Sequence, residues 1–529
     1  MLKTKKWGYL TITLLVAGLL FSLIGTAHAA VNISGTDRAD LIRTFDVLDK
    51  VGNNGNWYRT STNDSGALAW NEGPVIYSYL RMYEATRDKN YLDRFILHAD
   101  SILKNRDSER GVSDYRGLSL PAWRAGGKYT LDGKYYIFAA HTGMIASPLA
   151  DFARIVKEYN LQEYQDKAAV YLQAARDAVA VHDDEWVDEG DQGYYIIRKG
   201  APVWSDGVGI PFNMYLILGE AQISLYQVTG DPIYLERATK MARHFKSHLT
   251  VDQATGAYVW NYYWGLAYTG WTAANNPTTN TPEYRGYKNV EDIRHGVLDM
   301  RFAEKAYRAG IVFNEQDMIR FGKTVTSNII KAIDSVAFQV DGRGTDGTNR
   351  LTGWTMLYPW APQILDVDKN APYIAAGSMA GLSLYIKALS EINGWNETTP
   401  PADNGGKGPG DGGITPPSDN EPPEEPVNGG TTPPAEEPPA VPEQVQNGDF
   451  SNDRTGWQGK YGEPGVEANG NKYISNGANW GLYQDIALEA GKEYVINADT
   501  RKGSAGTAAR IVVLGIDAGG RLITTDPVD

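Results

Sequence analysis

Two acids, an arginine and a histidine fall within five positions, in the stretch from Glu291 to His295. The periodicity that follows predicts an amphipathic helix starting here. On such a helix, Glu291 and Asp292 lie four and three residues before His295, so both carboxylates neighbour the imidazole and favour its charged form. Beside Arg294, a half-buried histidine with acid partners is a candidate acid–base group. The alternative is a structural ion cluster at a helix start.

Three further histidines invite the same question. His141 stands where an aromatic loop meets an apolar helix, so it is either a second candidate or a satisfied core residue. His244 and His248 have the spacing of metal ligands on a helix but lack the intervening Glu of zinc hydrolases, which favours a structural role. The acidic run at 182–193 lacks the ligand spacing of a specific calcium loop. Calcium is therefore possible but unsupported, and we predict no cofactor and no metal site.

Tryptophan, glycine and polar residues gather in the long stretches between predicted helices. Aromatic faces stack on sugar rings while neighbouring amides and charges bind hydroxyl groups, so this mixture predicts a carbohydrate groove. The alternative is that many of these rings belong to the core. The predicted substrate-binding residues are Trp70, Asn71, Trp123, Arg124, Trp204, Trp260 and Trp264.

These stretches have to be positioned by residues 31–397, in which helical periodicity dominates. Two segments, "YEATRDKNYLDRFILHA" and "YQVTGDPIYLERATKMA", share residues at the same offsets. Each predicts the end of one helix, a Thr-x-Asp turn in which Asp caps, and the start of the next helix. Helical hairpins repeated in this way predict a mainly α fold, an α/α toroid built as a helical-hairpin barrel.

The two ends of the chain have different compositions. Residues 1–30 carry three lysines, an apolar run and the small-residue pattern "GTAHAA", which predicts a cleaved secretory signal; the alternative is an uncleaved membrane anchor. Residues 398–443 are rich in Pro, Gly and acids and predict a disordered linker. Residues 444–529 alternate with period two, which predicts a β-sandwich module with its last strands missing.

Composition excludes several classes of function. The chain has no cysteine, and its formal charge is −14. Nucleic acid is excluded as a partner, because phosphate binding needs concentrated Lys and Arg. No segment after the signal is apolar enough to cross a bilayer, so we expect a secreted protein. An anionic sugar polymer stays possible, and the sequence carries no signal for an oligomeric state.

Four strings resemble the α/α-toroid enzymes that act on uronic-acid polysaccharides, notably the alginate and glucuronan lyases: "LAWNEGPVIYSYLRMYEATRDKNYL", "HTGMIASPLADFA", "WSDGVGIPFNMYLILGEAQISLYQVTGDPIYLERA" and "EDIRHGVLDMRFAEKAYRAG". The opening of the last module, "VQNGDFSNDRTGWQG", resembles jelly-roll carbohydrate-binding modules. The first resemblance implies β-elimination of an acidic polysaccharide. Its implied catalytic residues are Asn213 as carboxylate partner, Tyr262 or Tyr263 as acid, His141 or His295 as base, and Arg294 as a further clamp.

Three other functions fit the same residues. A glycoside hydrolase on the same scaffold would use two carboxylates, for which Glu72, Asp206 and either Glu291 or Asp292 are available. A uronate C5-epimerase would share the proton abstraction. A non-catalytic protein with two glycan-binding modules would need none of this chemistry. The lyase is the main prediction and the hydrolase its principal alternative.

Overall fold

The computed structural model describes residues 38–52, 58–373 and 376–395, together with six short strands between residues 463 and 528. Residues 38–395 make a helical unit. Its inner segments are α2 Gly73–Thr86, α5 Ala139–Glu158, α7 Phe212–Thr229, α10 Ile293–Arg308, the 3-10 segment η9 Thr352–Leu357 and α13 Ala376–Asn393.

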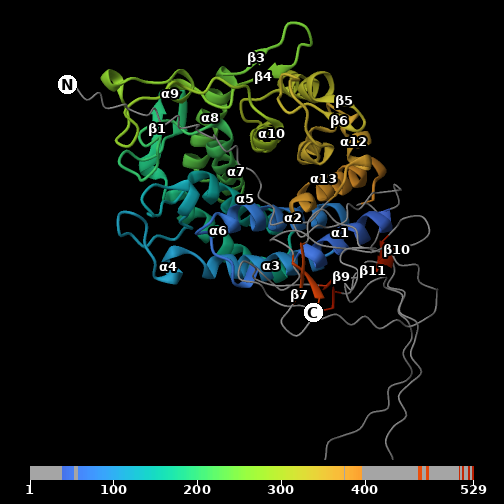
Figure 1. The fold of residues 1–529 in the computed structure, drawn as a ribbon. Coiled ribbons are helices and arrows are strands. Elements are labelled where there is room, and N and C mark those ends of the chain that lie inside the picture. The colour runs from blue at the N-terminus through green and yellow to red at the C-terminus, as the bar shows by residue number, and fades with distance from the viewer. Residues whose placement is uncertain are drawn as a thin grey trace, which may run out of the picture. The chain divides into compact units, whose positions relative to one another are not determined.

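Each inner segment packs on the next along the chain, and the last packs on the first. Figure 1 shows α2, α5, α7, α10 and α13 following one another around a ring. At the closure, the Ser390 hydroxyl on α13 donates to the Ala85 carbonyl on α2 at 2.9 Å. The α/α toroid predicted from the repeated hairpins is therefore confirmed.

A second layer of helices lies outside this ring. Its members are α1 Arg38–Gly52, α3 Asn90–Lys104, α6 Gln165–Ala180, α8 Pro232–Ser247, α11 Glu315–Lys323 and α12 Ile364–Asn370. Each covers one or two inner segments: α3 packs on α2, α6 on α5, α8 on α7 and α1 on α13. The apolar faces between the two layers form one continuous core.

The turns before α8 and α11 have the capping chemistry that the sequence predicts, whereas the N-cap position of α3 is Lys89 and Asp88 accepts from the Asn90 amide at 2.9 Å. Asp231 caps α8, its carboxylate accepting from the Ile233 amide at 3.2 Å. Gly310, with a φ of 71°, follows the end of α10, and Asn314 with Asp317 forms a capping box on α11. A left-handed residue stops a helix without the steric cost that a side chain would bring, and an N-cap satisfies free amides at the start of the next.

Because inner and outer helices alternate, the inner segments all run in the same direction. Gly73 meets Met144, and Gly143 meets Leu218, so the beginnings of α2, α5 and α7 lie side by side. The beginning of α7 in turn contacts Glu291, two residues before α10. We call this end of the ring the mouth; it comprises the first turns of α2, α5, α7, α10 and η9.

The loops between the helices contain the remaining short elements of the helical unit. Strands β1 Trp186–Glu189 and β2 Gln192–Tyr195 pair antiparallel, with Trp186 opposite Tyr195. The other short elements are α4 Asp107–Arg110, α9 Gly265–Thr269, β3 Thr250–Val251, β4 Tyr258–Val259, β5 Ile330–Ala332, β6 Ser335–Val336, the π-helical segments η2 Leu68–Glu72 and η7 Thr324–Ile329, and 3-10 turns at η3 Gly127–Tyr129, η4 Gln162–Tyr164, η5 Asp183–Glu185, η6 Ala273–Asn275 and η8 Thr348–Arg350.

The C-terminal strands form three two-stranded sheets: β7 Glu463–Val466 with β8 Lys472–Ser475, β9 Ile511–Val512 with β12 Pro527–Val528, and β10 Gly515–Ile516 with β11 Leu522–Thr524. The first and last of these pairs are antiparallel. The predicted signal at 1–30 and linker at 398–443 lie outside the described residues, as does most of 444–529. The jelly-roll module therefore stays a prediction. Within the described residues, none of the helices combines the length and apolarity that a membrane span requires.

A carboxyl and histidine cluster at the head of helix α10

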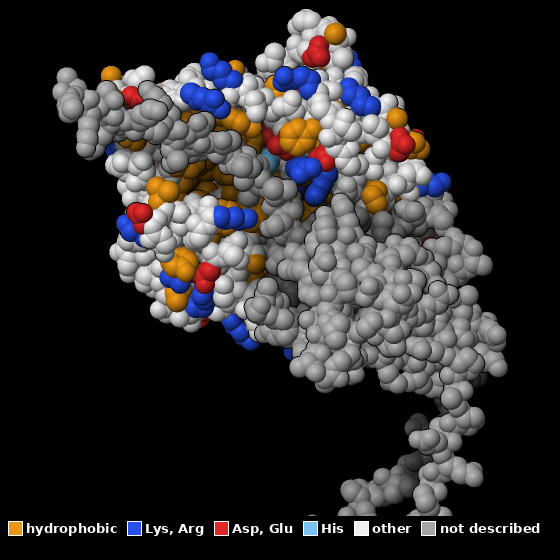
Figure 2. Space-filling model, viewed as in Figure 1, with side chains coloured by type: hydrophobic (Ala, Val, Ile, Leu, Met, Phe, Trp, Pro, Cys, Tyr) orange, Lys and Arg blue, Asp and Glu red, His pale blue; other side chains and the backbone are white. Residues whose placement is uncertain are grey.

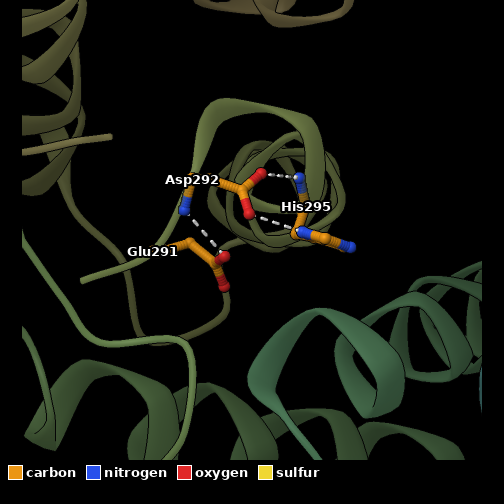
Figure 3. Close-up of side chains that lie close together, drawn as sticks. All are labelled: Glu291, Asp292 and His295. Carbon is orange, nitrogen blue, oxygen red and sulfur yellow. Dashed lines mark hydrogen bonds and ion pairs between the residues drawn. The ribbon is translucent and has the colours of Figure 1, made fainter. Parts of the chain in front are cut away.

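Glu291, Asp292 and His295 come together where the chain enters α10 (Figure 3). Asp292 is the N-cap: its carboxylate accepts from the amides of Arg294 and His295 at 2.9 and 3.1 Å. The Asp292 amide donates to Glu291 at 2.9 Å. The predicted spacing therefore brings both acids to the helix start, although Glu291 lies before the helix rather than on it.

Asp292 also binds the ring of His295, with 2.7 Å between its carboxylate and Nδ1. Burial alone would raise the pKa of Asp292, but the hydrogen bond and positive charge of His295 and the two amide donors together lower it below the ordinary value. The carboxylate is thus ionised at neutral pH. It fixes the ring orientation and leaves Nε2 of His295 without a partner in the described part of the chain.

Glu291 has the opposite electrostatic environment. It is fully buried, and burial followed by the negative charges of Asp299 and Asp292 raises its pKa well above the ordinary value. Asp299, about two turns along α10 from the N-cap Asp292, is also fully buried and shares a hydrogen bond with Glu291; its pKa is raised well above the ordinary value by burial. Trp260 Nε1 donates to Asp299 at 2.8 Å. Glu291 and Asp299 therefore hold protons at neutral pH.

Asn213, at the start of α7, completes the buried part of the cluster. Its amide nitrogen donates to Glu291 at 3.3 Å, and its side-chain oxygen has no partner among the described residues. An unsatisfied buried amide oxygen costs free energy, so a bound ligand that donates to it would be favoured.

Three half-buried tyrosines form a wall beside His295. The Tyr262 ring lies 5.2 Å from the His295 ring, edge to face. Tyr262 also packs on Tyr263 and Tyr287, at centroid distances of 4.7 and 5.9 Å. Burial raises the pKa values of both Tyr262 and Tyr263, so their hydroxyls stay protonated. The structure thus places Tyr262 and Tyr263 beside His295, and Glu291 links this group to Asn213.

Arg294 and His141 have other partners. The guanidinium of Arg294 is bound bidentately by Asp346, at 2.7 and 2.8 Å, which neutralises its charge. His141 lies at the head of α5, bound by Asn63 at 3.1 Å and surrounded by aromatic rings, including that of Trp70 at 5.3 Å. Burial lowers the pKa of His141 to about 3. It is a neutral core histidine at the mouth and makes no described contact with the α10 cluster.

The predicted substrate-binding residues divide by burial. Trp123 and Trp260 lie wholly in the core and have no face free for a sugar. Trp70, Trp204 and Trp264 are half-buried near the mouth, and Trp204 is stacked on Trp271. The remaining two are the half-buried Asn71 in η2 and Arg124, which binds Asp64.

Two of the acids available to a hydrolase are occupied elsewhere. Glu72 is paired with His98 inside the wall between α2 and α3. Asp206 is fully buried and accepts from the amides of Thr279 and Gly200, so it fastens two loops together. Only Glu291 and Asp292 lie at the cluster. Sequence reasoning missed Asp299 and Tyr287, although Asp299 was marked by its spacing of seven residues from Asp292 on one helical face.

The cluster also has donors suited to a cation. One oxygen or nitrogen from each of Glu291, Asp292 and His295 lies within 4.8 Å of the others. A cation there would compete with the proton between Asp292 and His295. In the view of Figure 2, a hollow lined by hydrophobic side chains opens in the helical unit, and a histidine is visible at its edge beside acidic and basic side chains.

No family model and no curated protein matches this chain. Solved structures with a similar fold include a family 76 glycoside hydrolase from a bovine Bacteroides thetaiotaomicron strain (14% identity, covering 62% of this chain and 69% of that chain, TM-score 0.38). Another is a family 76 alpha-1,6-mannanase of a Salegentibacter species, an inactive variant in complex with alpha-1,6-mannotriose (13%, 67% and 100%, 0.40). A D-mannose isomerase also matches (13%, 61% and 86%, 0.37).

The prediction of a uronate lyase is wrong: the matching structures are named glycoside hydrolases and mannanases. The structure also removes part of the lyase's predicted machinery, since Arg294 is neutralised by Asp346 and His141 lies apart from the cluster. With TM-scores between 0.37 and 0.41, the likeness assigns no role to individual residues. The function is therefore argued below from the cluster itself.

Proposed function

We propose that this protein is a glycoside hydrolase that cleaves a polysaccharide at the mouth of the helical ring. One observation carries the proposal: two consecutive carboxyl groups, Glu291 and Asp292, have pKa values shifted in opposite directions. Glycosidic cleavage needs one protonated and one ionised carboxyl group. A pair of carboxyl groups whose environments separate their pKa values supplies both at the same pH.

Glu291 is the proton donor in this proposal, and Asp292 is the nucleophile. The proton passes from Glu291 to the glycosidic oxygen as the bond from that oxygen to the anomeric carbon breaks. Asp292 attacks the anomeric carbon, and water later releases the sugar. One oxygen of each group lies within 4.8 Å of the other, which is less than the spacing of about 6.5 Å or more that admits a water in inverting enzymes.

The neighbouring residues serve these two groups. His295 keeps Asp292 ionised and oriented, and Asn213 holds Glu291. Tyr262 and its neighbours offer aromatic faces to the sugar. Glu291 has no exposed surface, so the proposal requires side chains around it to move when substrate binds.

The polysaccharide has further predicted contacts. Trp70, Asn71, Trp204 and Trp264 stay proposed substrate-binding residues, because each is partly exposed near the mouth. Export through the predicted signal would bring the enzyme to a polymer that cannot enter a cell, so we propose that it acts outside the cell.

The test compares products and variants. Purified protein is incubated with neutral and acidic polysaccharides, and reducing ends are followed alongside ultraviolet absorbance. A hydrolase releases reducing ends without the absorbance of an unsaturated sugar. Glu291→Gln and Asp292→Asn should each lower kcat by about 10²- to 10⁴-fold. Glu304→Gln, at the other end of α10, is the control. Unsaturated products, or full activity in both variants, would refute the proposal.

A further inference from the structure

The mouth contains two arginines with different electrostatic environments. Arg294 is satisfied: Asp346 binds its guanidinium through two hydrogen bonds, and the Asp346 side chain is only 7% exposed. Asp346 also accepts from the Gly347 amide at 2.8 Å. The carboxylate is therefore committed to Arg294 and to its own loop.

Arg350 has no such partner. It is the last residue of η8, it is half-buried, and no hydrogen bond, ion pair or ring contact of its side chain is found with the residues described here. Burial and the positive charge of Arg294 lower the pKa of Arg350, and the negative charge of Asp346 opposes them only in part; the group stays charged at neutral pH. A partly desolvated charge that shares its counter-ion with Arg294 costs free energy, so an anion at this position would be stabilised.

Arg350 also lies near the head of α10, where it experiences the charge of Arg294. It is two residues before the start of η9 at Thr352, and a Cβ added to Gly353 would approach Val297 on α10. The Trp354 indole packs against Gly296 and donates to the Ile293 carbonyl at 2.8 Å. The segment from Arg350 onward therefore runs along the first turns of α10, the helix that positions His295.

We propose that Arg350 is an anion-binding subsite that recognises a carboxylate or sulfate group on a sugar of the polysaccharide. The guanidinium presents a planar fork of donors that matches two oxygens of either group. That the ligand is a polysaccharide follows from the proposed function, on which this inference rests. It assigns specificity to Arg350, whereas cleavage is assigned to Glu291 and Asp292.

Binding tests this subsite separately from catalysis. Three trisaccharides are titrated calorimetrically at low ionic strength: a galacturonate trimer, a sulfated galactose trimer, and the carboxyl-reduced form of the first. The protein is the full chain carrying Glu291→Gln, which prevents turnover. We expect an anionic trimer to bind about 10-fold or more tightly than the neutral one, since a charge-assisted pair contributes that much. Which anionic trimer binds distinguishes carboxylate from sulfate.

Adding Arg350→Gln should abolish the preference for the anionic trimer and leave the affinity for the neutral trimer unchanged. Arg350→Lys should retain part of the preference. Arg343→Gln is the matched control, because Arg343 is 65% exposed and already paired with Asp341. Equal binding of all three trimers, or a preference that survives in Arg350→Gln, overturns the subsite. If Arg350→Gln does not fold, Arg350→Lys decides. A preference that is undiminished in Arg350→Lys and that the Arg343→Gln control loses at high salt would show general charge attraction, and it would overturn recognition by the planar guanidinium. If anion preference is found but the wild-type protein releases no reducing ends from any polysaccharide, the hydrolase is refuted and the subsite stands.

Discussion

At the residue scale, the protonation states in the cluster are set by how few charges the buried environment can stabilise. Glu291, Asp292 and Asp299 are three acids within two turns, and full ionisation of all three would place like charges together in a buried space. His295 and two backbone amides stabilise the charge on Asp292. The other two carboxyl groups are left with each other, and they keep their protons.

Asp299→Asn should move the basic limb of the pH–activity profile to lower pH. Activity requires protonated Glu291, whose pKa is raised by burial and, once Asp299 has lost its own proton on the alkaline side, by the negative charge of Asp299. Removing that charge lowers the pKa of Glu291, so the proton is lost at a lower pH. The acid limb, which Asp292 sets below its ordinary pKa, should stay in place. The measurement is kcat/KM against pH.

Asp368→Asn is the matched control for this shift. Asp368 is also fully buried, burial raises its pKa well above the ordinary value, and Thr355 is its side-chain partner at 2.6 Å. It does not contact Glu291. A basic limb that stays fixed in Asp299→Asn, or that moves equally in both variants, would contradict the role assigned to Asp299.

His141 should make the fold sensitive to acid. Its pKa is lowered to about 3 by burial, so the folded protein keeps it neutral while the unfolded chain protonates it near pH 6.5. Stability from this group is complete above pH 6.5 and is lost as pH falls toward 3, by at most about 1.4 kcal/mol per pH unit. His141→Gln should show a shallower fall in the free energy of unfolding. The exposed His248→Gln should retain the wild-type slope.

At the element scale, the ring was predictable because local signals specify its parts. The Thr-x-Asp turns, the Gly310 stop and the Asn314 cap each mark a helix boundary within a few residues of sequence. Placement of the candidate residues at one end of the ring also follows, since alternating hairpins make the inner helices parallel. Local signals do not specify contacts between loops. The sequence therefore did not predict that Arg294 pairs with Asp346 or that Asp206 binds Thr279.

Gly143→Ala should destabilise the ring at the contact between α5 and α7. A Cβ at this position would lie 2.6 Å from the backbone nitrogen of Leu218, which has no room to retreat. We expect a loss of about 1–3 kcal/mol in the free energy of unfolding. Denaturant unfolding followed by circular dichroism measures it. Val170→Ala, at a position 51% exposed on α6, should change little; equal effects of the two would contradict the close approach.

At the scale of the whole molecule, a buried ion network joins the inner helices away from the mouth. Asp151 on α5 binds Arg81 on α2, Arg154 on its own helix, and Lys305 on α10. Lys305 is 154 positions from Asp151 along the chain, so no spacing rule could have paired them. The network exists only once the ring has closed. It also shows why charge alone was a poor guide to the site, because most buried charges here hold helices together.

Asp151→Asn should therefore weaken the whole ring without altering chemistry at the mouth. The substitution leaves Arg81, Arg154 and Lys305 short of a counter-charge in a buried space, which typically costs about 3–5 kcal/mol. The positive partners hold the pKa of Asp151 well below its ordinary value against the effect of burial. Its contribution is present above about pH 4, the ordinary range of an aspartate, and is lost as pH falls toward its folded pKa.

Glu158→Gln is the matched control for Asp151→Asn, because Glu158 pairs with the same Arg154 but is 52% exposed. Its loss should cost about 1 kcal/mol or less in the free energy of unfolding. The free energy of unfolding at pH 7 should separate the two variants. At a temperature where both stay folded, kcat/KM of each should match that of the wild type. A loss of activity in Asp151→Asn under those conditions would mean that the network also positions residues at the mouth.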